Sequence, residues 1–265
     1  MTPAHFTVEI FFRLVIHELM NCYKKVVYLD SDLVVDVDIA ELYNIELGQN
    51  LVAAVRDVDS AGCYKAFDPT RPEYFKKHLK LSNPYSYFNS GVLLMNLDEM
   101  RKQYSEEYIF SLAQNKELMF PDQDVLNILC ENKVLYLDGA WNTMMNHEDS
   151  NVSRLQVAKL APHSIYKEYM EARKSPKIIH FAGYQKPWIY VDCDMSEYFW
   201  KYAMKTTFYP MLISTILLSK DTSCKKNGRW IENKVLRNIV NLIFPIGSKR
   251  RWILKQILRN FKVLS

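Results

Sequence analysis

Two aspartates, Asp30 and Asp32, follow an apolar run in the segment Lys24–Val35 (KKVVYLDSDLVV). Two like charges held this close together repel each other unless a cation lies between them. Carboxylate oxygens are the ligands that Mg²⁺ and Mn²⁺ prefer, and these ions usually keep positions open for water or phosphate. The pair therefore predicts a divalent metal site that could hold a diphosphate, with a plain role as turn and cap residues as the alternative.

A histidine and a lysine much later in the chain could complete such a site. His180 follows an apolar run in HFAGYQKPW, Gly183 permits close approach of the backbone, and Lys186 lies six residues beyond His180. A neutral imidazole can bind a metal, and an ammonium group can hold phosphates as a point charge. Each residue taken singly also fits a structural reading, as a core histidine and a surface lysine.

The segment FPDQDVLN supplies further acidic groups. Pro121, Asp122 and Asp124 favour the start of a helix, where negative charge is stabilised. Stabilisation of the helix start is enough to explain Asp124. Asp122 and Gln123 are expected on the side of the turn that could face a ligand.

The segments that carry these residues are short apolar runs separated by helical patterns. Strands are predicted in Val26–Leu29, Leu51–Val55, Tyr87–Leu97, Lys133–Asp138 and Lys177–Gly183, and helices in Thr7–Cys22, Asp98–Ala113 and from near Asp122. Strands that are apolar on both faces and alternate with helices indicate an α/β sheet covered on each side. Ligands bind beyond the carboxyl ends of such strands, so we expect Asp30, Asp32, Asp57, Asn89 and His180 to converge there.

The composition bounds the class of protein. At 265 residues and 49% hydrophobic, the chain can bury the core of one large domain, alone or with an appendage. Five scattered cysteines, never in a C-x-x-C pair, predict free thiols in a reducing compartment rather than disulfides or a zinc site. The N-terminus shows no pattern of a secretion signal, which predicts a cytoplasmic protein.

The charge distribution predicts two regions, a domain over 1–205 and a tail over 206–265. From Lys220 to the end, 12 lysines and arginines face two acidic residues, while the rest of the chain is mildly acidic. Large apolar residues with tryptophan at helical spacing among these charges predict basic amphipathic helices, which suit an anionic membrane surface. Pro210 is expected to interrupt any long helix. Nucleic acid is not an expected partner, because no recognition fold accompanies the charge. The other alternative is that these helices pack on a part of the domain that is missing from this sequence.

The order of the motifs FFRL, VVYLDSDLVV, YFNSGVLLMNL, FPDQDVLN and KIIHFAGYQKPW, between His5 and Tyr202, resembles the retaining family 8 glycosyltransferases. This family includes bacterial lipooligosaccharide galactosyl- and glucosyltransferases and glycogenin. The resemblance implies a GT-A (Rossmann-like) α/β fold, with a mostly parallel sheet and helices on both faces. It also implies transfer of a hexose from a UDP-sugar to a glycan or glycolipid acceptor, in the synthesis of cell-surface polysaccharide or lipopolysaccharide.

The resemblance assigns the metal side of the site to five residues. Asp30, Asp32 and His180 would bind Mn²⁺ (or Mg²⁺) that bridges the donor diphosphate. Gly183 and Lys186 would contact the phosphates. A Lewis acid and an ammonium group there would stabilise the charge that develops as UDP departs.

The resemblance assigns the sugar side to a second set. Arg13, Asp57, Asn89 and Asp122 would hold the sugar, and carboxylates such as Asp122 would stabilise positive charge on its ring. Gln123 matches the residue beneath the reacting carbon that has been considered as a nucleophile. An amide is a poor nucleophile, so reaction on one face of an oxocarbenium-like species is the alternative. Asp122 and Gln123 are thus the predicted catalytic residues.

The N-terminus departs from the family pattern. Family members have a uridine-binding strand and a second strand before the helix that carries the FFRL motif, whereas Met1 lies only twelve residues ahead of Arg13. The sequence thus predicts an N-terminally incomplete domain with an exposed sheet edge. A complementing chain or a second copy is expected to cover this edge, and the chain alone is expected to be weakly active or inactive.

Two other functions fit parts of the sequence. A truncated, non-catalytic relative could dock on a full-length transferase. VVYLDSDLVV also fits the pattern of haloacid-dehalogenase-type phosphatases, which need a further lysine and a second acidic pair after a later strand. KVLYLDGAWN and KIIHFAGYQKPW do not provide that pair.

Overall fold

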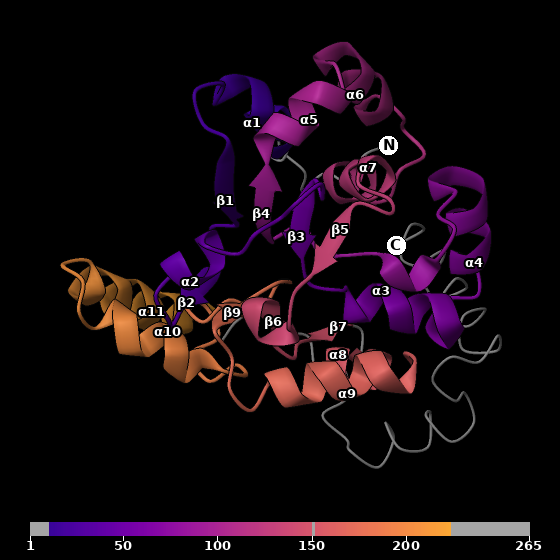
Figure 1. Ribbon diagram of the computed structural model, residues 1–265. Helices are drawn as coiled ribbons and strands as arrows, with labels where there is room; N and C mark the ends of the chain where they lie inside the picture. Colours follow the sequence, from indigo (N-terminus) through magenta and orange to yellow (C-terminus); the bar gives the residue numbers. More distant parts are fainter. Residues whose placement is uncertain (1–10, 150–151, 224–265) are drawn as a thin grey trace.

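The computed structural model describes residues 11–149 and 152–223, whose strands form three sheets (Figure 1). The strands are β1 (Lys25–Leu29), β2 (Leu33–Val35), β3 (Val52–Ala54), β4 (Val92–Asn96), β5 (Val134–Tyr136), β6 (Thr143–Met144), β7 (Glu148–Asp149), β8 (Val152–Ser153) and β9 (Ile178–His180). The sheets have the strand orders β1-β4-β3-β5, β2-β9-β6 and β7-β8.

Helices cover these sheets and connect their strands. The α-helices are α1 (Phe12–Leu19), α2 (Ala40–Tyr43), α3 (Val58–Gly62), α4 (Arg71–Tyr74), α5 (Leu97–Gln103), α6 (Glu106–Ala113), α7 (Pro121–Leu129), α8 (Arg154–Ala158), α9 (His163–Ala172), α10 (Ser196–Ala203) and α11 (Tyr209–Ser223). Short π-helical turns η2 (Cys63–Phe67) and η3 (Phe75–Leu79) extend α3 and α4, and 3₁₀ turns η4 (Pro84–Ser86) and η5 (Gly139–Asn142) precede β4 and β6. The predicted α/β class is confirmed.

The four-stranded sheet is mixed rather than mostly parallel. β4 pairs antiparallel with both β1 and β3, and the pairing of β3 with β5 is parallel. Three strands therefore share one direction and β4 opposes them. The direction of β4 follows from the segment before it, which enters from the end where β1 leaves: the N–H of Asp30 donates to the carbonyl of Gly91 over 2.8 Å.

The two faces of this sheet are covered differently. One face packs on α1, α5, α6 and α7, through a cluster that includes Leu93 and Met95 of β4. Val92 and Leu94 of the same strand lie in a second cluster with Leu42 of α2 and Ile178 of β9. Helices therefore lie on both faces, as predicted, but on the second face the short α2 shares the cover with the second sheet.

Two predicted element boundaries are wrong. The strand predicted in Tyr87–Leu97 begins only at Val92, because Phe88 pairs with Arg56 only as an isolated bridge and the N–H of Ser90 bonds to Oε1 of Gln123. The helix predicted in Asp98–Ala113 is divided into α5, capped by Asn96, and α6, capped by Ser105. The predicted cap Thr7 lies outside the described residues, and α1 begins at Phe12.

The described part of the tail, residues 206–223, consists mainly of α11, whose first turn contains Pro210. Proline is tolerated there, because the first turn of a helix has no intrahelical partner for its N–H groups. Pro210 thus begins this helix rather than interrupting it. In the described part of the chain, no helix is both long and apolar enough to cross a membrane. The basic helices predicted over 224–265 lie outside the described residues, and the division at 205/206 stays a prediction.

The outer side of β1 forms one edge of the four-stranded sheet. Among the described residues, no strand pairs with that side. An open edge presents unpaired backbone N–H and C=O groups that can join another strand. A complementing chain or a second copy at this edge stays a prediction.

A buried histidine in α1 predicts a pH dependence of stability. His17 is fully buried, and neither ring nitrogen has a hydrogen-bond partner among the described residues, although Glu18 lies 3.7 Å away. Burial lowers the pKa of His17 below its ordinary value of 6.5, and Glu18 offsets this only in part. The folded chain thus favours the neutral ring. The contribution of the neutral ring to stability is therefore intact above the ordinary pKa of histidine and is lost as the pH falls below it.

Replacement of His17 by leucine tests this dependence. We expect His17→Leu to reduce the fall in melting temperature between about pH 7.5 and about pH 5.5, because leucine has no proton to gain. Thermal denaturation of both proteins across that range measures the difference. Parallel melting curves for the two proteins would contradict the prediction.

Candidate metal and donor site

The predicted metal ligands lie together. Asp30 follows β1, Asp32 precedes β2 and His180 ends β9, and one ligand atom from each lies within 4.8 Å of the other two. Nε2 of His180 is 3.3 Å from Oδ1 of Asp32 and 3.9 Å from Oδ2 of Asp30. Within residues 11–149 and 152–223, this is the one group of three or more such ligands.

The backbone explains why residues 150 positions apart meet here. The chain passes from the four-stranded sheet to the second sheet through the turn that holds both aspartates. β9 then pairs with β2 so that His180 lies opposite Leu33, and the N–H of Phe181 donates to the carbonyl of Asp32 over 2.9 Å. The spacing of the three ligands is therefore set by strand pairing.

The donor set fits a hard divalent ion. Two carboxylates suit Mn²⁺ and Mg²⁺, which prefer oxygen ligands, and an imidazole is a common metal ligand that can complete the set. Two cationic side chains beside the cluster balance part of its negative charge, since Arg13 bonds to Asp30 over 2.7 Å and Lys186 bonds to Asp32. The residues present therefore match the ion that the sequence predicts.

Lys186 lies at the edge of this cluster. Its Nζ donates to the carboxylate of Asp32 and, over 2.7 Å, to the carbonyl of Phe181. Burial acts to raise the pKa of Asp32, but the interactions with His180 and Lys186 outweigh burial and hold that pKa well below its usual range. Asp32 therefore remains a carboxylate across the physiological range.

Arg13 connects the metal side of the site to the sugar side. Its guanidinium donates to Oδ1 of Asp30, to the backbone and side-chain oxygens of Ser90 over 3.0 Å each, and lies 3.2 Å from Asp122. It also stacks over the ring of Tyr28 at 4.5 Å. Burial raises the pKa of Asp122, although Arg13 opposes this shift.

The remaining sugar-side residues form one hydrogen-bonded group. Nε2 of Gln123 and Nδ2 of Asn89 each donate to Oδ2 of Asp57 over 3.3 Å. Oε1 of Gln123 accepts from the N–H of Ser90 over 2.9 Å and from its hydroxyl over 3.2 Å. Asp57 also caps α3 by accepting from the N–H of Ser60 over 2.8 Å, and burial raises its pKa.

Gly183 lies in the loop between His180 and Lys186, at a φ of +115°. Glycine adopts this conformation readily, and a Cβ atom here would lie 3.0 Å from Nδ1 of His147. Arg154 of α8 holds the start of this loop, since its guanidinium donates to the carbonyl of Ala182 over 3.2 Å. Gly183 is thus placed by packing on His147 rather than on the three ligand residues.

Asp124 has the structural role that the sequence favours. Its carboxylate accepts from the N–H of Phe120 over 2.8 Å and from the hydroxyls of Tyr74 and Tyr87 over 2.5 and 2.6 Å. These bonds anchor the first turn of α7, so that Asp122 and Gln123 on the same turn face the site.

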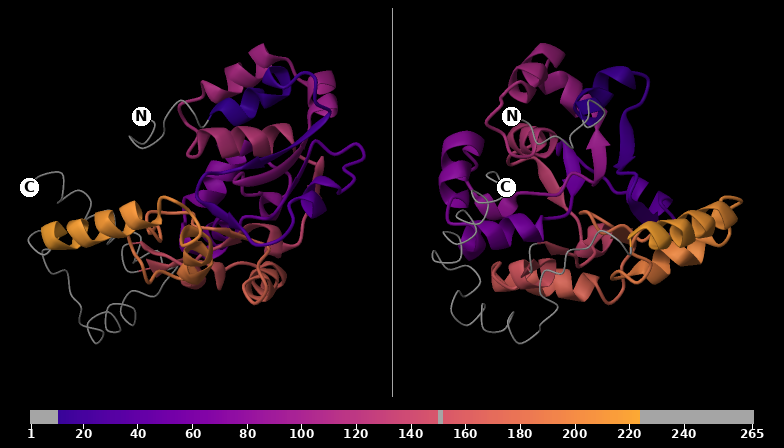
Figure 2. Two further views of the ribbon diagram at one scale, coloured as in Figure 1. Left: turned by 90° about the vertical axis from the view of Figure 1, so that its left-hand side faces the viewer. Right: turned by 180° about the vertical axis from the view of Figure 1, so that it is seen from behind.

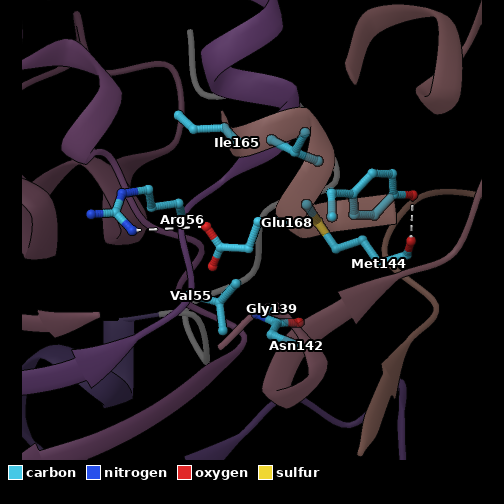
Figure 3. Close-up of a pocket in the computed structure, with 9 residues that line it drawn as sticks. Val55, Arg56, Gly139, Asn142, Met144, Ile165 and Glu168 are labelled. Atoms are coloured by element: carbon cyan, nitrogen blue, oxygen red, sulfur yellow. Dashed lines mark hydrogen bonds and ion pairs between the residues drawn. The ribbon is translucent and has the colours of Figure 1, made fainter. Parts of the chain in front are cut away.

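Three residues of the site were not predicted: Ser90, Gly91 and Asn142. The first two follow Asn89 in the motif YFNSGVLLMNL, so their place in that motif was a usable signal. No motif or residue spacing in the sequence marked Asn142 as part of the site. Its side chain bonds to both Asn89 and His180, and it lines a cavity of about 20 Å³ on the other side (Figure 3).

Solved structures share this fold. The chain matches a structure of the bifunctional glycosyltransferase WbbM with a TM-score of 0.67 and 30% identity, over 80% of this chain and 38% of that one. It matches the galactosyltransferase LgtC, in complex with donor and acceptor sugar analogues, with a TM-score of 0.58 and 26% identity, over 78% of this chain and 70% of that one. The fold is that of the GT-A glycosyltransferases.

The chain belongs to glycosyl transferase family 8, whose model matches residues 1–192. It is 27% identical to general stress protein A of Bacillus subtilis (strain 168) over 193 residues, 70% of this chain and 60% of that protein. It is 29% identical to the lipopolysaccharide 1,2-glucosyltransferase of Escherichia coli (strain K12) over 184 residues, 67% of this chain and 48% of that protein. The chain thus spans about half the length of the curated relatives it matches. The family favours glycosyl transfer over the phosphatase alternative.

Proposed function

We propose that this chain carries the donor site of a retaining, metal-dependent hexosyltransferase. It would transfer a hexose from a UDP-sugar to a glycan or glycolipid acceptor in the synthesis of cell-surface polysaccharide or lipopolysaccharide. The observation that carries this proposal is the close grouping of Asp30, Asp32 and His180 beside Lys186. Membership of family 8 and the similarity to a lipopolysaccharide 1,2-glucosyltransferase support the substrate class.

The metal side of the site would act on the leaving group. Asp30, Asp32 and His180 would hold Mn²⁺ (or Mg²⁺), which when bound supplies a Lewis acid for the diphosphate. Lys186 already points into this cluster, and its ammonium group would balance the charge that develops on the departing UDP. Gly183 would allow the backbone of the same loop to approach the phosphates.

The sugar side would orient the hexose and stabilise its ring. Arg13 holds Asp122 in place, and Asp57 and Asn89 hold each other, so their remaining hydrogen-bonding capacity is available to sugar hydroxyls. The negative charge of Asp122 would stabilise the positive charge that develops on the ring. Ser90 donates two hydrogen bonds to Oε1 of Gln123, which favours a positioning role for this amide over attack on the sugar.

Calorimetric titration of the chain with UDP tests the proposal. We expect UDP to bind in the presence of Mn²⁺ and to lose its affinity when EDTA removes the ion. The reason is that Asp30, Asp32 and His180 would interact with the diphosphate only through the bound metal. UDP-glucose and UDP-galactose, titrated in the same way, would compare the two hexoses. Equal binding of UDP with Mn²⁺ and with EDTA contradicts the proposal, and no binding under either condition favours the non-catalytic alternative.

We also propose that the tail places the chain at the inner face of the cell membrane as a peripheral protein. Phe208, Met211 and Leu217, in and next to α11, are each more than 60% exposed. This helix lies at the end of the molecule away from α5 and α6 (Figure 2), and the sequence that follows it is strongly basic. Exposed apolar side chains beside basic residues suit an anionic lipid surface.

Vesicle sedimentation tests this second proposal. We expect more binding to vesicles that contain phosphatidylglycerol than to neutral ones, with a decrease at high salt, because each basic residue near the surface contributes about 1 kcal/mol. Met211→Glu is expected to weaken the binding, whereas Tyr108→Glu, at an exposed aromatic of α6, is the matched control and should not. Equal binding to neutral and anionic vesicles would contradict the electrostatic part, and an unaffected Met211→Glu variant would contradict the part played by α11.

A further inference from the structure

We infer that Asn142 is the positioning residue for His180, which it holds with Nε2 turned toward Asp30 and Asp32. This inference rests on the proposed function, because it concerns the same metal site. The argument starts from a backbone N–H group, whose direction of donation is certain, and follows the hydrogen bonds from there to the imidazole ring.

The orientation of the Asn89 amide is fixed at both ends. The backbone N–H of Gly91 donates to Oδ1 of Asn89 over 3.0 Å. The other end of the amide, Nδ2, donates to the carboxylate of Asp57 over 3.3 Å, and a carboxylate can only accept. Oδ1 of Asn89 is therefore an acceptor at a known position.

The orientation of Asn142 follows from that of Asn89. The Asn142 atom that lies 2.8 Å from Oδ1 of Asn89 must be a donor, so it is Nδ2. The opposite end of the Asn142 amide is then Oδ1, an acceptor, and it lies 2.9 Å from Nδ1 of His180. Nδ1 of His180 must therefore carry a hydrogen.

The ring nitrogen left to bind a cation is Nε2. It is the nitrogen that lies 3.3 Å from Oδ1 of Asp32 and 3.9 Å from Oδ2 of Asp30. In metal sites, the second nitrogen of a histidine ligand commonly donates to an oxygen, which fixes the tautomer and the direction of the ring. Asn142 occupies that place here.

Packing holds the same ring in one plane. His180 and Asn142 are each 3% exposed, so water does not compete for their hydrogen bond. A Cβ atom at position 91 would lie 2.3 Å from Cε1 and 2.9 Å from Nδ1 of His180, so the ring rests directly on the Gly91 backbone. The ring is thus confined by Gly91 and directed by Asn142.

Asn142 also connects the two sides of the site. Through Asn89 it is joined to Asp57, which Gln123 contacts, while its other end holds His180. Asn142 ends the turn η5 and borders the small cavity of Figure 3, which could admit a water if the side chain were shortened. A shortened side chain would remove the amide oxygen that accepts from Nδ1 of His180.

The first experiment uses the metal-free protein. In ¹⁵N-histidine-labelled chain kept in alkaline buffer, long-range ¹H–¹⁵N spectra distinguish the two ring tautomers, and loss of one signal in His180→Gln assigns His180. We expect the Nδ1–H tautomer in the wild type and a shift toward Nε2–H in Asn142→Ala. A wild-type ring with its hydrogen on Nε2 overturns the inference, and this result does not depend on whether the chain transfers sugars.

The second experiment measures affinity for Mn²⁺ alone, by electron paramagnetic resonance of the free ion. We expect Asn142→Ala to weaken Mn²⁺ binding by about 10- to 100-fold, as is typical for partners of metal-binding histidines. Asn96→Ala is the matched control, because Asn96 caps α5 and bonds to Gly48, and it should change stability without changing Mn²⁺ affinity. Equal Mn²⁺ affinity in Asn142→Ala and wild type overturns the inference, whereas a wild type that binds no Mn²⁺ contradicts the proposed function and leaves the tautomer result as the test.

Discussion

Asp32→Asn is expected to remove Mn²⁺-dependent UDP binding and to lower the hexose transfer that the chain supports, weak as it is expected to be, by about a thousandfold. Asp32 is in contact with both His180 and Lys186, so the variant removes a metal ligand and the charge that holds the ammonium group. Loss of a metal ligand removes several kcal/mol of transition-state stabilisation, and about 4 kcal/mol corresponds to three orders of magnitude in rate. Calorimetry with UDP and Mn²⁺, and release of hexose from the UDP-sugar, measure the two effects.

Asp38→Asn is the matched control for this variant. Asp38 is an exposed aspartate six residues along the same segment, and its carboxylate accepts from the N–H of Ala40. An asparagine retains that bond, so binding and transfer are expected to stay within about twofold of wild type. If Asp32→Asn kept Mn²⁺-dependent UDP binding at the level of Asp38→Asn, the metal site would have to lie elsewhere.

Arg154→Met is expected to lower the free energy of unfolding by about 3 kcal/mol. Arg154 is 5% exposed, and its guanidinium bonds to Asp59 over 2.7 Å and to the carbonyls of Met145 and Ala182. Methionine fills much of the same space but leaves the carboxylate and two carbonyls without their donor. For a chain of this size, the change corresponds to a fall in melting temperature of about 6–12 °C.

Lys174→Met provides the comparison for Arg154→Met. Lys174, just beyond α9, forms an exposed ion pair with Glu171 of that helix. Such a pair contributes less than about 1 kcal/mol to stability. Differential scanning calorimetry of the three proteins measures the difference. A melting temperature for Arg154→Met as close to wild type as that of Lys174→Met would show that the buried network does not stabilise the loop before Gly183.

The metal side of the site could be predicted from the sequence because each residue follows an apolar run. Asp30 and Asp32 end one such run and His180 ends another, and the structure brings all three together. The roles of the predicted residues in binding and catalysis stay predictions. Their positions required only that the strands be recognised, since polar groups at strand ends meet at one edge.

The direction of β4 and the role of Asn142 could not be predicted in this way. An apolar strand is equally apolar whichever way it runs, so Val92–Asn96 gave no sign that it opposes β1 and β3. Asn142 meets His180 only because β6 pairs with β9, and two-residue strands such as β6 leave no periodic pattern. The double role of Asp57 could not be predicted either, because its one carboxylate both caps α3 and accepts a hydrogen bond from Asn89.

The turn that holds both aspartates is also the passage between the four-stranded and the three-stranded sheet. Asp30 bonds to the carbonyl of Gly91, directly before β4, whereas Asp32 accepts from the N–H of Phe181, directly after β9. A divalent ion bound by both aspartates would connect the two sheets, and the unfolded chain would have no comparable binding site for it. The free energy of unfolding would then rise with the concentration of that ion, by about 2.7 kcal/mol at a hundred times its dissociation constant.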